Sequence, residues 1–207
     1  MGYTAGMSGE PKRINIVEPT LSSEAGHCHS FVASFCAGRG SGGEAIDVYA
    51  GSRASLPRLS ASGIRVVPYF HRRIRRPEAF LLYRKLLREP GRIFVSTAGR
   101  ADMTLLSLAA GGVIPPRKVF LYFHWVNLTP ERREFFRKAA IRQPHLVLLG
   151  PTPTVTGIFR ECGFADVETV PYPATSAAGT REGGPFRHLL YAGAARQDKG
   201  FGRIVDL

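Results

Sequence analysis

The sequence predicts an α/β fold, in which a Rossmann-like parallel sheet is flanked by helices. Short apolar runs alternate along the chain with segments of helical periodicity, the order typical of β-α-β units. Within most of the short runs the apolar positions run continuously instead of alternating, as in strands buried on both faces. The chain has 207 residues, of which 44% are hydrophobic, so it is long enough to bury such a core.

Seven runs rich in β-branched and aromatic residues are the candidate strands. They cover residues 14–17, 46–50, 64–68, 93–96, 119–124, 146–149 and 167–170. Each is bounded by turn residues or by a helical segment, which favours short strands joined by helical crossovers.

Five segments between these runs have the apolar spacing of helices. They cover residues 26–37, 77–89, 102–110, 130–140 and 154–162. Pro77 and Pro130 suit the first position of a helix, and Thr129 is a candidate N-cap. Gly163 follows the last periodic residue, Cys162, as a C-terminal glycine does.

The composition changes after residue 172 and indicates a domain boundary. We expect residues 1–172 to form a Rossmann-like N-terminal domain and residues 173–186, which are rich in Gly, Pro and small polar residues, to form a linker. Residues 187–207 then have the pattern of the first strand and the start of a helix in a second α/β domain. One strand and one helix start do not make a core, so we expect this second domain to be truncated.

The charge of the chain indicates an anionic partner. Lys and Arg number 28 and Asp and Glu 16, a net charge of +12. The three cysteines, Cys28, Cys36 and Cys162, have neither the number nor the spacing of a disulfide framework or zinc site, so we expect packing residues in a reducing compartment. The first residues contain no apolar segment of signal-peptide length. We expect a cytoplasmic protein, with peripheral association at the inner face of the cell membrane as an option.

The loop after the first predicted strand, residues 18–26, is a candidate phosphate site. It lies at the carboxyl end of that strand, where open α/β sheets bind ligands. It ends with Gly26 at the start of a predicted helix, where unpaired backbone N–H groups attract anions. In the alternative reading, the polar residues before Gly26 only cap the helix; these are Ser22, Ser23 and Glu24.

His124 is the candidate catalytic residue. It ends the predicted strand 119–124, and a polar residue at that position faces the crevice; a core or surface histidine is the alternative. His27 and His29 surround Cys28 in a tract similar to a metal-binding sequence. Residues two apart on a helix point to different sides, so we expect no metal there.

The positive charge is concentrated in residues 71–92, which we name the basic segment. It carries eight Lys and Arg residues against two Glu residues, half of the net charge of the chain. Its predicted helix has an apolar stripe and a cationic face, the pattern of a surface that contacts anionic membranes. The membrane-facing candidates are Arg72, Arg73, Arg75, Arg76, Arg84, Lys85 and Arg88. A solvated helix face is the alternative.

Three segments give the chain a resemblance to GT-B-fold glycosyltransferases. The segment INIVEPTLSSEAGHCHSF resembles the first strand and glycine loop of the retaining group that includes glycogen and sucrose synthases and bacterial polysaccharide glycosyltransferases. VETVPYP resembles the crossing into the second domain of these enzymes. HLLYAGAARQDKGF resembles the opening strand and the Lys-Gly turn of that domain.

The resemblance implies two Rossmann-like domains that face a cleft, with the acceptor held mainly by the first and the nucleotide-sugar donor by the second. In the family, an Arg and a Lys contact the donor pyrophosphate. Lys199, before Gly200, matches the lysine, whereas Ala194 stands where the arginine is expected and Arg196 follows two residues later. Gly26 matches the glycine loop that approaches the donor phosphates. Further donor motifs would lie beyond Leu207, so we expect the chain alone to be inactive.

We therefore expect part of a glycosyltransferase that moves a sugar from a nucleotide-sugar to a glycan or lipid-linked acceptor. A Lys, an Arg and a helix N-terminus neutralise a departing diphosphate without a metal, and the chain has no Asp-x-Asp sequence, so we expect neither metal nor cofactor. The alternative is a non-catalytic basic α/β module that binds anionic membrane. Nucleic acid is the weaker alternative, because aromatic residues do not interleave with the arginines of residues 72–76.

Overall fold

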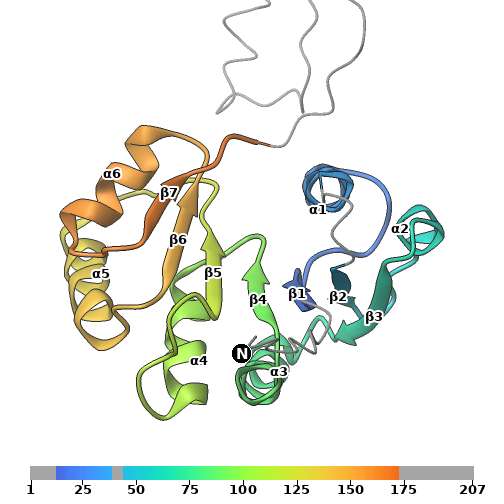
Figure 1. Cartoon of the computed structure of the whole chain (residues 1–207), viewed down its shortest axis with the longest axis horizontal. Coiled ribbons are helices and arrows are strands. Elements are labelled where there is room, and N and C mark those ends of the chain that lie inside the picture. Colours follow the sequence, from blue (N-terminus) through green and yellow to red (C-terminus); the bar gives the residue numbers. More distant parts are fainter. Residues whose placement is uncertain (1–12, 39–43, 173–207) are drawn as a thin grey trace, which may run out of the picture. The chain divides into compact units, whose positions relative to one another are not determined.

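The computed structural model describes residues 13–38 and 44–172, which form the predicted α/β architecture (Figure 1). Seven parallel strands make one sheet in the order β3-β2-β1-β4-β5-β6-β7. The strands are β1 (Arg13–Val17), β2 (Ala45–Gly51), β3 (Arg65–Phe70), β4 (Arg92–Val95), β5 (Val119–Tyr122), β6 (Val147–Gly150) and β7 (Val167–Thr169).

The order of the strands reverses beside β1. The chain moves outward from β1 through β2 to β3, then crosses back to β4 and moves outward the other way to β7. Ile16 of β1 is consequently paired with Val48 of β2 on one side and with Phe94 of β4 on the other. The loops that leave β1 and β4 diverge at such a reversal, and the carboxyl edge of the sheet at this point is where open α/β sheets bind ligands.

Helices cover both faces of the sheet in the described part of the chain (Figure 1). They are α1 (His27–Ala37), α2 (Pro57–Ala61), α3 (Arg75–Arg88), α4 (Arg100–Ala110), α5 (Pro130–Arg142) and α6 (Pro153–Glu161). One core cluster packs Phe31 of α1 and Leu59 of α2 against the sheet. The other contains side chains from α3 to α6, among them Leu82 and Phe159. This division is what right-handed crossovers on a sheet that reverses direction produce.

Several predicted helix ends are confirmed. The Oγ1 atom of Thr129 accepts a hydrogen bond from the backbone N–H of Arg132 at 3.3 Å, so Thr129 is the N-cap of α5. Gly163 follows α6 with a φ of 97°, a conformation that glycine adopts without steric cost.

The structure differs from the predictions made from the sequence at three places. α3 begins at Arg75, so Pro77 is its third residue; the first turn tolerates it there because those N–H groups have no intrahelical acceptor. β5 ends at Tyr122, and His124 lies two residues beyond it. α2 was not predicted, because five residues are too few to show a helical period.

Asp47 is the charged residue inside the β1-β2-β3 region of the sheet. Its side chain is 5% exposed and accepts hydrogen bonds from Arg13 at 3.0 Å and from Arg65 at 2.8 and 2.5 Å. The hydrogen bonds from Arg65 are the main reason why the pKa of Asp47 is lowered from its ordinary value. The two arginines thus tie the amino ends of β1 and β3 to β2.

The predicted linker and second domain lie outside the described residues, and so do Arg196 and Lys199. Within residues 13–38 and 44–172, no helix has both the length and the apolar character that crossing a bilayer requires.

Candidate functional site

Two histidines and a tyrosine meet at the carboxyl edge of the sheet. His27 is the first residue of α1, His124 follows β5, and Tyr172 follows β7. Nε2 of His27 lies 3.2 Å from Nδ1 of His124 and 3.4 Å from the hydroxyl of Tyr172, and this hydroxyl also contacts Nδ1 of His124. We name these three residues the histidine cluster. Segments 145 residues apart in the sequence therefore meet next to the strand reversal.

The protein backbone determines which nitrogen of His124 carries the proton. Nε2 lies 2.7 Å from the carbonyl oxygen of Ser96, which only accepts, so Nε2 is the donor. In the neutral ring, Nδ1 is then the acceptor, and it accepts a hydrogen bond from Tyr172 or His27. Burial lowers the pKa of His124 from its ordinary value of 6.5, although the Ser96 carbonyl opposes this shift. His124 is consequently a neutral hydrogen-bonding group near pH 7.

A buried carboxylate supports the backbone around His124. Glu18, the residue after β1, is 1% exposed. Its Oε1 accepts a 2.5 Å hydrogen bond from the hydroxyl of Thr20, and its Oε2 accepts one of 2.7 Å from the hydroxyl of Ser96. Glu18 thereby connects the loop after β1 to the loop after β4, whose Ser96 carbonyl orients His124.

The start of α1 is open beside this cluster. Gly26 is the N-cap with a φ of 86°, no side chain caps the helix, and a Cβ atom built at Gly26 would meet nothing within 4 Å. Among the described residues, the backbone N–H groups of residues 26–29 have no acceptor. Ser22, Ser23 and Glu24 therefore do not cap the helix, and the N–H groups remain available to an anion. Glu24 instead pairs with Arg58 at 3.3 Å.

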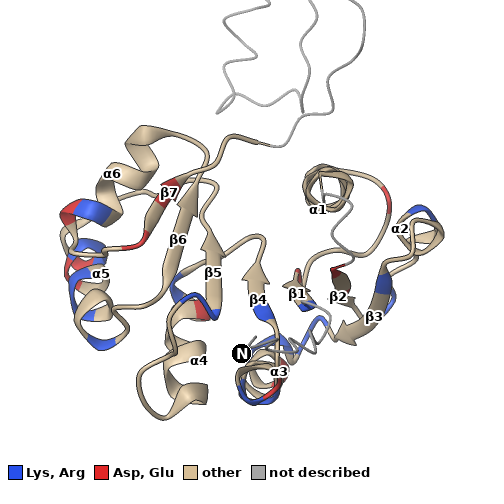
Figure 2. Ribbon diagram, in the orientation of Figure 1, with Lys and Arg blue, Asp and Glu red and all other residues tan. Residues whose placement is uncertain are grey.

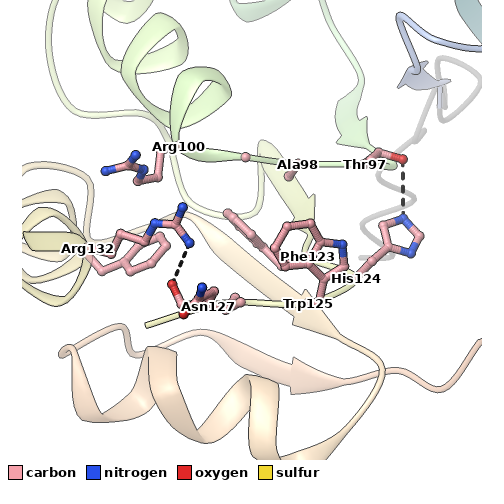
Figure 3. Close-up of a pocket in the computed structure, with 11 residues that line it drawn as sticks. Thr97, Ala98, Arg100, Phe123, His124, Trp125, Asn127 and Arg132 are labelled. Carbon is pink, nitrogen blue, oxygen red and sulfur yellow. Dashed lines mark hydrogen bonds between the residues drawn. The ribbon is translucent and has the colours of Figure 1, made fainter. Parts of the chain in front are cut away.

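A cavity of about 230 Å³ lies on the other side of His124 (Figure 3). Its wall includes Trp125, which is 74% exposed, together with Asn127 and residues 97–100, which lead into α4. Arg100 and Arg132 both line it, and Nη1 of Arg132 donates to the backbone oxygen of Asn127 at 2.7 Å. An open aromatic face, an amide and two guanidinium groups suit a small polar ligand.

The partly buried Asp102 and the buried Tyr83 hold this wall of the cavity in place. Asp102 Oδ2 accepts the backbone N–H of Gly99 at 2.9 Å, and Oδ1 accepts the hydroxyl of Tyr83 at 2.7 Å. Tyr83 belongs to α3 and is fully buried. The pair therefore anchors the start of α4 to α3. Burial raises the pKa of Asp102, and the hydrogen bond from Tyr83 partly offsets this shift.

The basic segment divides into two groups in the structure. Lys and Arg residues extend from the end of β3 along α3 (Figure 2). Arg72, Arg73 and Arg75 line a second, larger cavity of about 900 Å³ at the carboxyl ends of β1 to β3. Four of the other cations are exposed on α3, namely Arg76, Arg84, Lys85 and Arg88, and the eighth, Arg92, begins β4. The predicted apolar stripe of α3 is confirmed as core, since Ala79, Leu82, Tyr83 and Leu86 are buried.

Of the predicted site residues that the structure describes, Gly26 and His124 come together, with His27 between them. The sequence did not identify His27 as a partner of His124, because nothing local relates two residues 97 positions apart. Tyr172 and the cavity at Trp125 were also missed. An exposed tryptophan directly after a candidate catalytic histidine was the available signal.

His29 is buried and His27 exposed, so the two histidines of the tract face different sides of α1, as their spacing predicts. In the described part of the chain, no three His, Cys, Asp or Glu side chains converge as a metal ion would require. No known protein family matches the sequence, and no curated protein matches it.

Proposed function

We propose that the chain is the acceptor-side part of a glycosyltransferase that uses a nucleotide-sugar donor. The observation that carries the proposal is the contact between His124 and His27 at the open N-terminus of α1, beside the strand reversal. One edge of the sheet thus offers a place for phosphates at the start of α1. It also offers a neutral imidazole, that of His124, within hydrogen-bond distance of His27, the first residue of α1.

The start of α1 provides what a departing diphosphate needs. Transfer of a sugar breaks its bond to the diphosphate, which keeps the electron pair and gains negative charge. Preorganised N–H groups stabilise developing charge of this kind, and the N–H groups of residues 26–29 are such donors. The positive end of the α1 dipole adds to their effect.

His124 is suited to hold the transferred sugar. Its Nδ1 atom accepts hydrogen bonds, and Tyr172 and His27 now occupy that acceptor. A sugar hydroxyl that displaces one of them donates a hydrogen bond to Nδ1 in its place. The cavity beside His124 supplies the other contacts typical of saccharide sites, namely the exposed ring of Trp125 and the side chains of Asn127 and Arg132.

Binding measurements on the chain test this proposal. We expect at least one nucleoside diphosphate sugar, among UDP-glucose, GDP-mannose and ADP-glucose, to bind more tightly than the matching nucleoside monophosphate in isothermal titration. His124→Ala should weaken that binding about tenfold, the effect of one hydrogen bond in a site of this kind. His145→Ala is the matched control, because His145 precedes β6 at the opposite edge of the sheet. Equal affinity of both variants, or no binding by any donor, contradicts the proposal.

A specific observation also favours the second candidate, a module that adsorbs to anionic membrane. The exposed cations of α3 are accompanied by two exposed large apolar side chains, Ile74 at 51% and Leu81 at 58%. Cations near an anionic surface each contribute about 1 kcal/mol before screening by salt. Sedimentation with vesicles tests this candidate: binding should need acidic lipid and fade as salt rises, and Arg84→Ser with Lys85→Ser and Arg88→Ser should abolish it. Equal binding to neutral vesicles contradicts it.

A further inference from the structure

The larger cavity is a cationic pocket at the same edge of the sheet as the histidine cluster. It has a volume of about 900 Å³ and is formed by the loops that follow β1, β2 and β3. Arg53 comes from the loop after β2, and Arg72, Arg73 and Arg75 come from the end of β3 and the start of α3. We name these four residues the arginine pocket.

Within residues 13–38 and 44–172, the arginine pocket has no carboxylate partner of its own. In the described part of the chain, none of its four guanidinium groups forms an ion pair. The nearest acidic residue on α3, Glu78, is used by His71, whose backbone N–H it accepts at 2.7 Å and whose Nδ1 it contacts at 2.6 Å. The Nε atom of Arg75 is buried without a hydrogen-bond partner. A buried donor without an acceptor is costly, and this one belongs to a residue that lines the cavity.

We propose that the arginine pocket binds a phosphate or diphosphate group, and that the sugar acceptor is therefore a phosphorylated molecule. Arginine forks match the oxygens of phosphate in pairs, and four cations that line one cavity suit a group that carries two or more charges. Ser22 and Ser52 also line the pocket, and their hydroxyl groups are further hydrogen-bond donors.

The loop after β1 connects this pocket to the histidine cluster. Thr20 lines the pocket, donates to Glu18 at 2.5 Å, and Glu18 accepts from Ser96, whose carbonyl holds His124. The same loop ends at Gly26 and His27. A phosphorylated ligand in the pocket is thus held against the loop that leads to the proposed transfer site. The identification of this ligand as the acceptor rests on the proposed function; the binding of phosphate does not.

Titration calorimetry with glycerol 3-phosphate and with inorganic pyrophosphate tests the pocket, and glycerol is the uncharged control. The pocket variant is Arg53→Ser with Arg72→Ser and Arg73→Ser, since all three are exposed and their removal leaves the core intact. The control variant is Arg84→Ser with Lys85→Ser and Arg88→Ser, which removes the same charge from α3. We expect the pocket variant to bind at least tenfold more weakly, and the control variant to bind within about twofold of the original chain.

A third variant separates pairwise recognition from charge. Arg53→Lys with Arg72→Lys and Arg73→Lys keeps the charge but removes the planar forks, so we expect it to bind more weakly than the original chain and more tightly than the serine variant. Equal weakening by the serine variants of the pocket and of α3, or no binding of either phosphate compound by the original chain, overturns the proposal.

Two further arms identify the source of the phosphate and separate this proposal from the proposed function. Vesicles with phosphatidic acid should compete with glycerol 3-phosphate if the ligand is a lipid headgroup, whereas no competition indicates a soluble phosphorylated acceptor. The pocket variant should retain the nucleotide-sugar binding that His124→Ala weakens. If the pocket variant loses nucleotide-sugar binding to the same degree, the pocket holds the donor and the acceptor assignment is wrong. If the donor fails to bind at all while the pocket still binds phosphate, only the proposed function fails.

Discussion

Removal of the Tyr83 hydroxyl should destabilise the protein, because it breaks the buried contact that anchors α4. Tyr83→Phe removes the 2.7 Å hydrogen bond to Asp102 and leaves one carboxylate oxygen of this partly buried residue without its donor. Hydrogen bonds to charged groups contribute about 1.5–3 kcal/mol, so we expect a loss of about 2 kcal/mol in the free energy of unfolding. For a chain of this size that loss lowers Tm by about 4–8 °C.

The partner variant Asp102→Ala should cost more, because it removes two contacts. It deletes the cap on the Gly99 N–H, worth about 1 kcal/mol, and leaves the buried Tyr83 hydroxyl unpaired, which costs about 1–3 kcal/mol. The double variant has no Tyr83 hydroxyl to leave unpaired. Its loss in the free energy of unfolding should therefore be smaller than the sum of the losses of the two single variants by about 1–2 kcal/mol.

Unfolding in urea, followed by circular dichroism, measures all three variants. Tyr69→Phe is the matched control, because the Tyr69 hydroxyl has no hydrogen-bond partner among the described residues. The effect of Tyr83→Phe should also depend on pH. The Tyr83 hydrogen bond lowers the pKa of Asp102, so it favours the ionised form, and its loss should matter more near pH 8 than near pH 4. If the losses in unfolding free energy of the two single variants add up to that of the double variant within about 0.5 kcal/mol, the reasoning is refuted.

Two further variants test the sheet and a helix end. Asp47→Asn should lower the free energy of unfolding by about 1–3 kcal/mol at neutral pH. Because the folded-state pKa of Asp47 is lowered, the difference should begin to shrink as the pH falls below about 4 and be lost below the folded-state pKa, and urea titrations across pH that show a constant difference would contradict this. Thr129→Ala should cost about 1 kcal/mol through loss of the α5 N-cap, whereas Thr104→Ala inside α4 should cost less, and equal Tm values for the two would exclude a capping role.

The fold could be predicted from the sequence because the signals for each strand and helix lie within the residues of that element. Most strands contain adjacent apolar residues, and all five predicted helices have helical apolar spacing, four of them with a proline, threonine or glycine signal at an end. Errors occurred where local signals are weak. The five residues of α2 show no period, and Pro77 is compatible with either the first or the third position of α3.

The candidate site was predictable only in part. The positions of Gly26 and His124 follow from the rule that ligands bind at the carboxyl ends of strands. The contacts of His124 with His27 and Tyr172 depend on the strand order, which places β1 beside β4 and brings the end of β7 back toward α1. The arginine pocket depends on three loops that meet at the carboxyl ends of β1 to β3, and a count of charges along the sequence does not show this. The sequence therefore assigned Arg72, Arg73 and Arg75 to a membrane-facing surface, which stays a prediction, while the structure shows that they line a cavity.

Nuclear magnetic resonance of the chain during titration with a nucleoside diphosphate measures the central claim most directly. The claim is that the open start of α1 and His124 form one phosphate and sugar site. We predict that the largest backbone amide shifts occur at residues 26–29 and that the imidazole resonances of His27 and His124 move together with them. Shifts confined to residues 72–75, or an unchanged His124 at saturating ligand, would contradict the account.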